Sequence, residues 1–398
     1  MEAILVSNGP GELYTWAKPI LEELRNYPNI KVKICLIPCQ FASGNEYSIA
    51  KRFKPDGLSS AKEFLKFLST NIVPKSLGNS PDGFVISLGG NAKFAIKLAE
   101  KLNYKSYYYS FNPFWHKNLT RAFAHDEKCL KKIRRLGAKN NQAQLVGNLV
   151  ADAVNLEESI SISGSPKILL FAGSRNLHSV SLIPLLIGLV DVLVERYPEA
   201  SFIWPVSKLL SQETIEQGIA GESKEVLGGM AGIQQDNYII SPKGGKIEMV
   251  AEENRYAYMK SADLAVTIPG TNTLELGIAK LVAVVILPVN KLEHIPLEGI
   301  GQWLGYIPII GKYLKRYSVK LFLDGLKIPF SLPNRFSGQD LMLEHKGKIN
   351  PENVAAKVIE LLEDEKELKR RRAGLAATMP KAGAAKKIVN SILRDFDA

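Results

Sequence analysis

Two glycine-containing segments carry residue types that suit phosphate binding. Each follows an apolar run typical of a buried strand, 167–172 in one case and 262–266 in the other, and each precedes a predicted helix. Glycine permits close backbone approach, and free N–H groups where a helix begins attract an anion. An arginine behind the first turn suits bidentate contact with phosphate. The residues concerned are Gly173, Ser174, Arg175, Gly270, Thr271, Asn272 and Thr273.

Glu275 stands one turn into the helix predicted after the second loop. A carboxylate in this position can accept hydrogen bonds from vicinal hydroxyls, such as those of a ribose. Together with the two loops, it predicts a nucleoside diphosphate at the carboxyl edge of a parallel sheet. The alternative is an ordinary strand–helix turn followed by a surface glutamate.

The elements that position these loops alternate along the chain, which indicates an α/β fold with doubly wound parallel sheets. The chain of 398 residues is too long for one core, and the polar stretch 155–166 is typical of a linker. We therefore predict two Rossmann-like domains facing a cleft. The first is residues 1–160 joined by a C-terminal helix at 376–398, and the second is residues 161–375. The predicted strands of the first are 3–7, 32–38, 83–88, 106–110 and 121–124, and its predicted helices are 16–26, 61–69, 92–102 and 127–136.

Composition narrows the class of partner and the compartment. The net charge of +11 favours an anionic partner, and no nucleic-acid-binding motif is present. Three cysteines and five histidines show no metal-ligand spacing, so we expect no metal and no cofactor. No run reaches the roughly 18 apolar residues of a membrane span, and the first residues are expected to form a strand rather than a signal peptide. These features predict a cytoplasmic protein.

Five segments resemble lipid-A-disaccharide synthases, in order and in spacing. Residues 171–175 resemble the PGSR segment of that family, and residues 269–275 resemble its SGTxTLE segment. The other three are 146–152, which resembles VGHPLAD, 332–344, which resembles LPNLLAGRxxxPE, and 10–13, which takes the place of SGDLH. The similarity runs almost from end to end, so the chain resembles a divergent member of this GT-B glycosyltransferase family.

The resemblance implies an inverting, metal-independent glycosyltransferase. It would move a sugar of the N-acetylglucosamine type from a UDP donor to a lipid-linked acceptor, either in lipid A disaccharide synthesis or in that of a related glycolipid. The second domain would hold the UDP-sugar and the first the acceptor. The enzyme would be peripheral at the inner face of the plasma membrane, where its basic surface would meet anionic headgroups.

The catalytic base is the point at which the chain departs from the family. Lipid-A-disaccharide synthases carry an aspartate in an IDxPDF segment, but the matching residues 86–94 contain no carboxylate. The remaining candidate is Glu12, in the loop after the first strand, and its alternative role is to cap a helix near Tyr14. Gly89 and Gly90 resemble the glycine loop of the peptidoglycan lipid-intermediate N-acetylglucosaminyltransferase. The acceptor-side candidates are Gly11, Gly89, Gly90 and Asn91.

Further candidates lie elsewhere in the second half. His294 and Glu298 follow the strand after the Glu275 helix, where GT-B enzymes contact the donor sugar, and His178 follows Arg175. His178 is expected either to contact the phosphate or the sugar, or to be a surface residue at a helix start. Asn148 takes the place of a family histidine and is expected to be structural. Residues 300–330 mix aromatic and aliphatic residues with lysines and predict a membrane-facing segment. Its alternatives are a helical hairpin in the core and a homodimer contact.

Two other functions stay open at this stage. One is an enzyme similar to UDP-N-acetylglucosamine 2-epimerase, which would need a cleft rich in acids and histidines. The other is a non-catalytic relative that binds nucleotide-sugar or lipid, which the missing aspartate favours.

Overall fold

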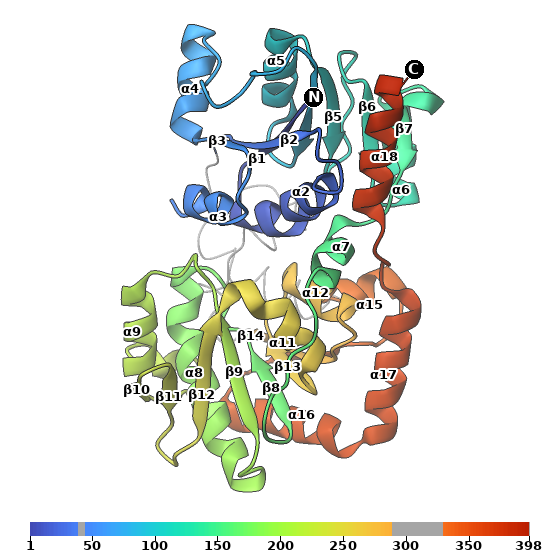
Figure 1. The fold of residues 1–398 in the computed structure, drawn as a ribbon. Coiled ribbons are helices and arrows are strands. Elements are labelled where there is room, and N and C mark those ends of the chain that lie inside the picture. The colour runs from blue at the N-terminus through green and yellow to red at the C-terminus, as the bar shows by residue number, and fades with distance from the viewer. Residues whose placement is uncertain (39–43, 289–328, 398) are drawn as a thin grey trace, which may run out of the picture. The chain divides into compact units, whose positions relative to one another are not determined.

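The computed structural model describes residues 1–38, 44–288 and 329–397. The chain forms two compact units (Figure 1). Unit 1 comprises Met1–Leu156 and Pro380–Ala398, and unit 2 comprises Glu157–Met379. The boundaries expected from the sequence, after residue 160 and before residue 376, lie four residues from these.

Unit 1 is a parallel sheet covered by helices. Its strands are β1 (Glu2–Ser7), β2 (Lys31–Leu36), β3 (Gly57–Ser59), β4 (Gly83–Leu88), β5 (Lys105–Tyr109), β6 (Arg121–Ala124) and β7 (Ala143–Leu145). Its helices are α1 (Pro10–Glu12), the π-helix η1 (Leu13–Ala17), α2 (Lys18–Leu24), α3 (Glu46–Arg52), α4 (Ala61–Thr70), α5 (Ala92–Leu102), α6 (Glu127–Arg135), the 3-10 helix η2 (Asn140–Gln142), α7 (Leu149–Asn155) and α18 (Ala384–Asp397).

The strand order in unit 1 is β3-β2-β1-β4-β5-β6-β7, and all its described pairs are parallel. The chain therefore reverses the direction in which it adds strands between β1 and β4. Successive residues of β1 face opposite sides, as the pleat requires. Ala3 and Leu5 belong to the core shared with α2 and α18, and Ile4 and Val6 to the core under α4 and α5.

The last helix, α18, packs into unit 1 although the chain passes through unit 2 before it (Figure 1). The carboxylate of Asp152 accepts hydrogen bonds from the N–H groups of Gly383, Ala384 and Ala385, at 2.9, 3.1 and 3.3 Å. A carboxylate at a helix start satisfies donors that have no partner within the helix. Asp152 ends the segment that resembles VGHPLAD, and here it anchors this helix.

Unit 2 is built around a second sheet. Its strands are β8 (Lys167–Leu170), β9 (Ser201–Val206), β10 (Ile233–Gln235), β11 (Tyr238–Ile240), β12 (Lys246–Ala251), β13 (Leu264–Thr267), β14 (Ala283–Pro288) and β15 (Leu343–Gly347). Its helices are α8 (Asn176–Arg196), α9 (Gln212–Ala220), α10 (Lys224–Leu227), the 3-10 helix η3 (Glu252–Asn254), α11 (Arg255–Ser261), α12 (Asn272–Ile278), α15 (Leu332–Ser337), α16 (Pro351–Glu363) and α17 (Glu365–Thr378).

The strand order in unit 2 is β10-β11-β12-β9-β8-β13-β14-β15. The strands from β12 to β15 are parallel, and β10 and β11 extend the sheet as an antiparallel edge. The chain reverses direction between β8 and β13, the two strands that the glycine loops follow. The predicted class, two doubly wound α/β units, is confirmed.

Helix α8 differs from the expectation in two respects. It begins at Asn176, whereas the sequence pattern predicts a helix from about residue 180 to residue 197. It is also long and apolar enough to cross a bilayer, with a mean hydropathy of 2.1 in its most apolar window. That corrects the view that no segment reaches this length. However, 78% of the window is buried inside the protein, which is typical of a core helix.

The first helical segment also begins earlier than the sequence predicted. It runs continuously from Pro10 through η1 to Leu24, instead of starting at residue 16. Proline suits a first helical position because its missing N–H would have no partner there. The start at Pro10 places Glu12 within the first turn rather than in a loop.

Candidate functional site

The two glycine loops of unit 2 lie against each other. Their strands, β8 and β13, are neighbours, and the N–H of Phe171 donates to the carbonyl of Val266 at 2.9 Å. Gly173 has a φ of +81°, and a Cβ there would lie 3.2 Å from Cδ1 of Ile268. Glycine is therefore needed both for the backbone conformation and for the close approach of the second loop.

Arg175 ends the first loop as the residue before α8. Its backbone is extended, with φ −118° and ψ 124°, and its side chain makes no capping hydrogen bond. The residue is exposed, and no hydrogen bond or ion pair of its guanidinium occurs within the described residues. The hydroxyl of Ser179 donates to the carbonyls of Ala172 at 2.8 Å and of Arg175 at 3.0 Å, which fixes the loop to the helix. A cation and a helix start are thus open to an anion in solvent.

The second loop divides between exposed residues and residues that shape it. Gly270 and Thr271 are exposed. The hydroxyl of Thr273 donates to the carbonyl of Gly270 at 2.8 Å and accepts from the N–H of Leu332 at 3.1 Å. The amide of Asn272 donates to the hydroxyl of Thr267. The hydroxyl of Thr273 is therefore used within the protein, whereas that of Thr271 faces solvent.

Glu275 is buried, so the surface-glutamate alternative is wrong. The residue is 5% exposed, and Arg255 holds both carboxylate oxygens, Nη2 to Oε1 at 3.2 Å and Nε to Oε2 at 3.2 Å. The hydroxyl of Tyr256 also donates to Oε1, at 3.1 Å. Burial lowers the pKa of Arg255, but the attraction of Glu275 outweighs it and holds that pKa well above its usual value. The ion pair leaves one acceptor position on Oε2, enough for one ligand hydroxyl.

A second polar cluster braces the same loop, and the sequence did not assign it. Glu344 of β15 accepts from the N–H and the hydroxyl of Ser331, at 2.8 and 2.6 Å, and from the amide of Asn334 at 3.1 Å. The neighbouring N–H of Leu332 is the donor to Thr273. The segment that resembles LPNLLAGRxxxPE thus supports the second glycine loop. Only the register of β15 beside β14 brings Glu344 to this place, so no local signal reveals the contact.

In unit 1, Glu12 lies among the corresponding loops after β1 and β4. A Cβ on Gly89 would come within 3.0 Å of Cγ of Glu12 and 2.9 Å of the Trp16 ring, and a Cβ on Gly9 would overlap the Glu12 carboxylate. Gly89 and Gly90 have φ values of +84° and +64°, which favour glycine. Burial raises the pKa of Glu12, and a hydrogen bond from its own backbone lowers it by less. The side chain makes no capping hydrogen bond to η1, and it lies in the first turn of the helical segment that starts at Pro10, where a carboxylate stabilises the helix start.

Polar atoms without partners surround this loop. Within the described residues, Ser7 Oγ, Asn8 Oδ1 and Trp16 Nε1 are buried and make no hydrogen bond. Such groups are rare in native proteins and often mark a place that binds a ligand or water. The π-helix η1, which carries Trp16, is a rare element that also occurs frequently at functional sites.

The remaining candidates take structural positions or fall outside the described chain. Asn91 caps α5, and its Oδ1 accepts from the N–H of Lys93 at 3.1 Å. Asn148 caps α7 in the same way, at 3.0 Å, and Gly11 is exposed. His178 is 8% exposed, so it is not a surface residue. His294, Glu298 and residues 300–328 lie outside the described residues.

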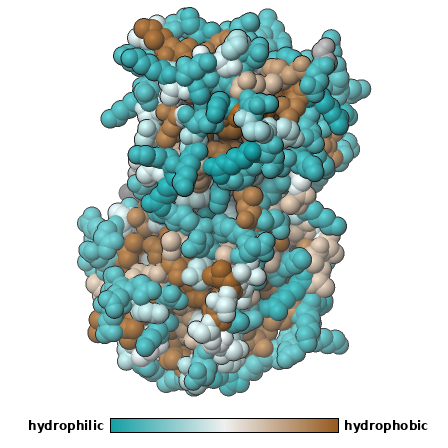
Figure 2. All heavy atoms as spheres, in the orientation of Figure 1, coloured by the Kyte–Doolittle hydropathy of each residue, from teal (hydrophilic) through white to brown (hydrophobic). Residues whose placement is uncertain are grey.

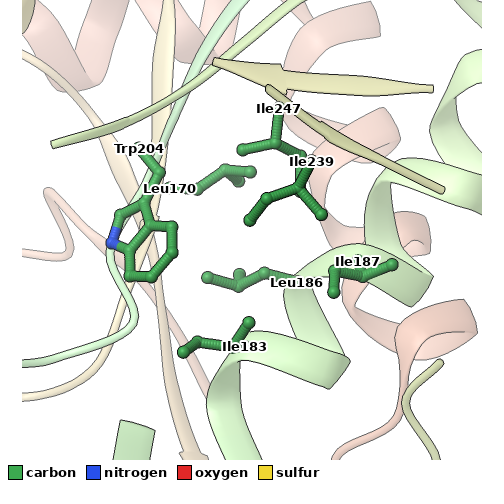
Figure 3. A pocket seen from close by; sticks show the side chains of 7 residues that line it. All are labelled: Leu170, Ile183, Leu186, Ile187, Trp204, Ile239 and Ile247. Carbon is green, nitrogen blue, oxygen red and sulfur yellow. The ribbon is translucent and has the colours of Figure 1, made fainter. Parts of the chain in front are cut away.

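A small apolar cavity in unit 2 is too small to hold a sugar nucleotide. Side chains from β8, α8, β9, β11 and β12 enclose it, and each that is labelled in Figure 3 is apolar or, in Trp204, an indole. Its volume of about 10 Å³ leaves room for about one water molecule.

In Figure 2, hydrophilic residues cover much of the visible face of each unit, with apolar residues between them. Within the described residues, no three histidine, cysteine or acidic side chains group as a metal site.

Comparison with known proteins supports the resemblance in part. No family model matches the chain. The chain is 25% identical over 216 residues to the lipid-A-disaccharide synthase of Geobacter metallireducens, a match that covers 54% of this chain and 44% of that protein. The corresponding protein of Geobacter sulfurreducens is 24% identical over 215 residues, with the same coverage. The chain therefore matches less than half the length of these relatives.

Solved structures agree on the fold. UDP-GlcNAc 2-epimerase from Neisseria meningitidis, bound to UDP-GlcNAc, has a TM-score of 0.54 at 14% identity and covers 99% of this chain and 100% of its own. The S. aureus MnaA structure with UDP has a TM-score of 0.54 at 14% identity, with coverage of 100% and 97%. The chain thus has the GT-B-like fold of UDP-sugar enzymes, with two Rossmann-like units.

Proposed function

We propose that this protein is an inverting glycosyltransferase that moves a sugar, of the N-acetylglucosamine type, from a UDP donor to a lipid-linked acceptor. The observation that carries the proposal is topological. In each unit, the loops singled out by the sequence follow the two strands at which the sheet reverses direction, β1 and β4 or β8 and β13. In open α/β sheets, ligands bind at such a switch point, beyond the carboxyl ends of the strands.

Unit 2 would bind the UDP part of the donor. The exposed guanidinium of Arg175 and the first N–H groups of α8 suit a diphosphate, and the exposed backbone at Gly270 and Thr271 leaves room for it. Glu275 would accept a hydrogen bond from one ribose hydroxyl through Oε2, while Arg255 holds its carboxylate in place. No metal or cofactor enters this proposal, because Arg175 and the helix start supply the positive charge.

Unit 1 would supply the base. An acceptor hydroxyl gives its proton to the carboxylate of Glu12, and its oxygen attacks the anomeric carbon of the donor sugar. The bond from that carbon to the diphosphate oxygen breaks, and UDP leaves with the electron pair. Arg175 and the α8 N-terminus would stabilise the charge that develops on the leaving diphosphate. A base whose pKa is raised toward neutrality by burial suits this step.

Two other functions compete with this one. The solved structures that share the fold include UDP-GlcNAc 2-epimerases, which favours an epimerase-like reaction at the same donor site. A relative that binds UDP-sugar without turnover is the third candidate, since residues 86–94 lack the carboxylate of lipid-A-disaccharide synthases.

The test is an incubation with radiolabelled UDP-N-acetylglucosamine, with and without a lipid acceptor that carries a free sugar hydroxyl, either an acylated glucosamine phosphate or a sugar linked to polyprenyl diphosphate. We expect UDP release and transfer of label to the organic phase, both only when acceptor is present. Formation of UDP-N-acetylmannosamine without acceptor would replace the proposal with epimerisation. Binding of UDP without formation of either product would instead support a relative that binds UDP-sugar without turnover.

A further inference from the structure

Helix α6 of unit 1 carries a concentrated basic surface. Between residues 127 and 139 the chain has six cations, and its acid in that stretch is Glu127 at the first position of the helix. The residues that face outward are Lys128, Lys131, Lys132, Arg134 and Arg135, and all five are exposed. None of the sites discussed above includes them.

Four of these cations form a single stripe. Lys128, Lys131, Lys132 and Arg135 are spaced i, i+3, i+4 and i+7, so they lie within about 100° of one another around the helix. The opposite side of α6 carries Cys129, Leu130 and Ile133, which are buried in the core of unit 1. The core therefore fixes the direction of the stripe outward, away from the sheet.

The stripe is not neutralised by the protein. Within the described residues, none of its four cations forms an ion pair, whereas several other helices carry paired charges, such as Lys369 with Glu365 in α17. The acids beside α6 lie at its start: Glu127 in the first turn, and Asp126, whose Oδ1 accepts from the N–H of Cys129 at 2.6 Å. Four like charges this close repel one another, so binding of an anionic partner to this surface is electrostatically favourable.

Apolar groups border the stripe at the C-terminal end of α6. Leu136 follows the helix and is 55% exposed, which is high for a leucine. The half-buried Trp115 lies next to Gly137, where a Cβ would be 3.7 Å from Cδ1 of the indole. A tryptophan and a leucine beside a row of lysines is a combination suited to the interface between headgroups and acyl chains.

We propose that the α6 stripe docks the protein on an anionic bilayer surface. The cations contact phospholipid headgroups, and Leu136 and Trp115 rest at the level of the glycerol groups. Charge complementarity with an anionic leaflet carries the choice of partner. Nucleic acid would also attract the cations, but the exposed leucine at the edge of the stripe gains nothing from phosphates and much from lipid. The surface uses residues distinct from Arg175, Glu275 and Glu12.

The test is co-sedimentation of the full chain with vesicles of 30% phosphatidylglycerol in phosphatidylcholine, at 50 mM and 500 mM NaCl. The variant is Lys128→Gln, Lys131→Gln, Lys132→Gln and Arg135→Gln combined. The matched control is Lys62→Gln, Lys66→Gln, Lys93→Gln and Lys101→Gln, four exposed cations of α4 and α5 in the same unit. Both lose the same net charge, so a nonspecific effect of charge is equal in the two.

We expect salt-sensitive binding of the wild type and the control, and a loss of roughly 10²-fold or more in the stripe variant, because each cation near an anionic surface contributes about fivefold. Leu136→Gln should weaken the vesicle binding that remains at 500 mM NaCl. Equal binding of the stripe variant and the control would overturn the proposal. So would loss of binding to a DNA duplex in the stripe variant with vesicle binding unchanged, which would assign the surface to nucleic acid.

The same variants separate this inference from the proposed function. UDP affinity, measured by calorimetry, should be equal in wild type, stripe variant and control. A protein that binds vesicles through α6 but binds no UDP would retain this inference and remove the proposed function.

Discussion

At the scale of single residues, burial decides what the candidate side chains can do. Glu12 and Glu275 are both carboxylates at the carboxyl edge of a parallel sheet. Glu275 forms an ion pair with Arg255, which leaves one acceptor position on its carboxylate for a ligand. Glu12 is half-buried against Gly89 and Trp16, and the partial loss of solvent raises its pKa. Glu275 therefore suits recognition of a hydroxyl, and Glu12 suits proton transfer.

Replacing Glu12 with glutamine should separate catalysis from binding. Because a positioned base contributes about 10²–10⁴ to the rate, Glu12→Gln should lose turnover by that factor and keep its affinity for UDP. The wild-type rate should rise with pH as the Glu12 carboxylate forms. Steady-state kinetics across pH values, with UDP calorimetry, provide the measurement. A control in the same helical segment, Glu23→Gln, should behave as the wild type.

The same substitution makes a prediction on stability. The pKa of Glu12 is higher in the folded state than in the unfolded state. Between these two pKa values the folded state binds more protons, so the free energy of unfolding falls as pH rises through that range. Glu12→Gln should therefore be at least as stable as the wild type at pH 7, with the difference shrinking below the ordinary glutamate pKa. A variant that is less stable at pH 7, or a wild-type rate that does not change with pH, would contradict the role of Glu12.

Spacing along the chain predicted Arg175 and Glu275 as candidates, because each lies in the loop or first helical turn that follows a predicted strand. It did not predict Arg255 and Tyr256, which lie about 20 residues before Glu275. Their contact exists because α11 packs beside the start of α12, an arrangement that no local pattern encodes. For the same reason no sequence pattern indicated a role for Glu344, which the pairing of β15 with β14 brings to Ser331.

At the scale of elements, strong periodicity made the core of each unit predictable. The strand at 83–88 and the helix at 92–102 have the predicted bounds, and β6 matches the predicted 121–124. The antiparallel edge β10–β11 was not predicted, because its strands are three residues long and largely exposed, so they carry no apolar alternation. The π-helix η1 was likewise beyond sequence patterns, which describe ordinary α-helices.

The docking of α18 depends on Asp152, and its removal should loosen that helix. Asp152→Ala leaves three N–H groups at the start of α18 without their acceptor, which should cost about 2 kcal/mol of local stability. Amide hydrogen exchange in residues 384–397 should become about 30-fold faster. Exchange at the wild-type rate would show that Asp152 does not anchor the helix. Asp82→Ala, at an exposed site of unit 1, is the control.

At the scale of the whole molecule, two units of one architecture place a switch point in each half of the chain. The charge of +11 is shared unevenly, and α6 is one place where it concentrates without compensation. We propose that the switch point of unit 2, between β8 and β13, binds a sugar nucleotide. That site is the central claim.

Arg175 is the most direct probe of the site. Glu275 is less suitable, because removing it would break its buried ion pair with Arg255, at a cost of about 3–5 kcal/mol of stability. Arg175 is exposed, so its replacement should not disturb the fold.

The decisive measurement is titration calorimetry of UDP with the wild type, Arg175→Ala and the exposed-arginine control Arg394→Ala of unit 1. We predict binding to the wild type and the control, and an affinity about 10- to 100-fold weaker in Arg175→Ala, the loss of one hydrogen-bonded charge contact. A wild type that does not bind UDP, or an Arg175→Ala protein that binds it as tightly as the wild type, would contradict the account.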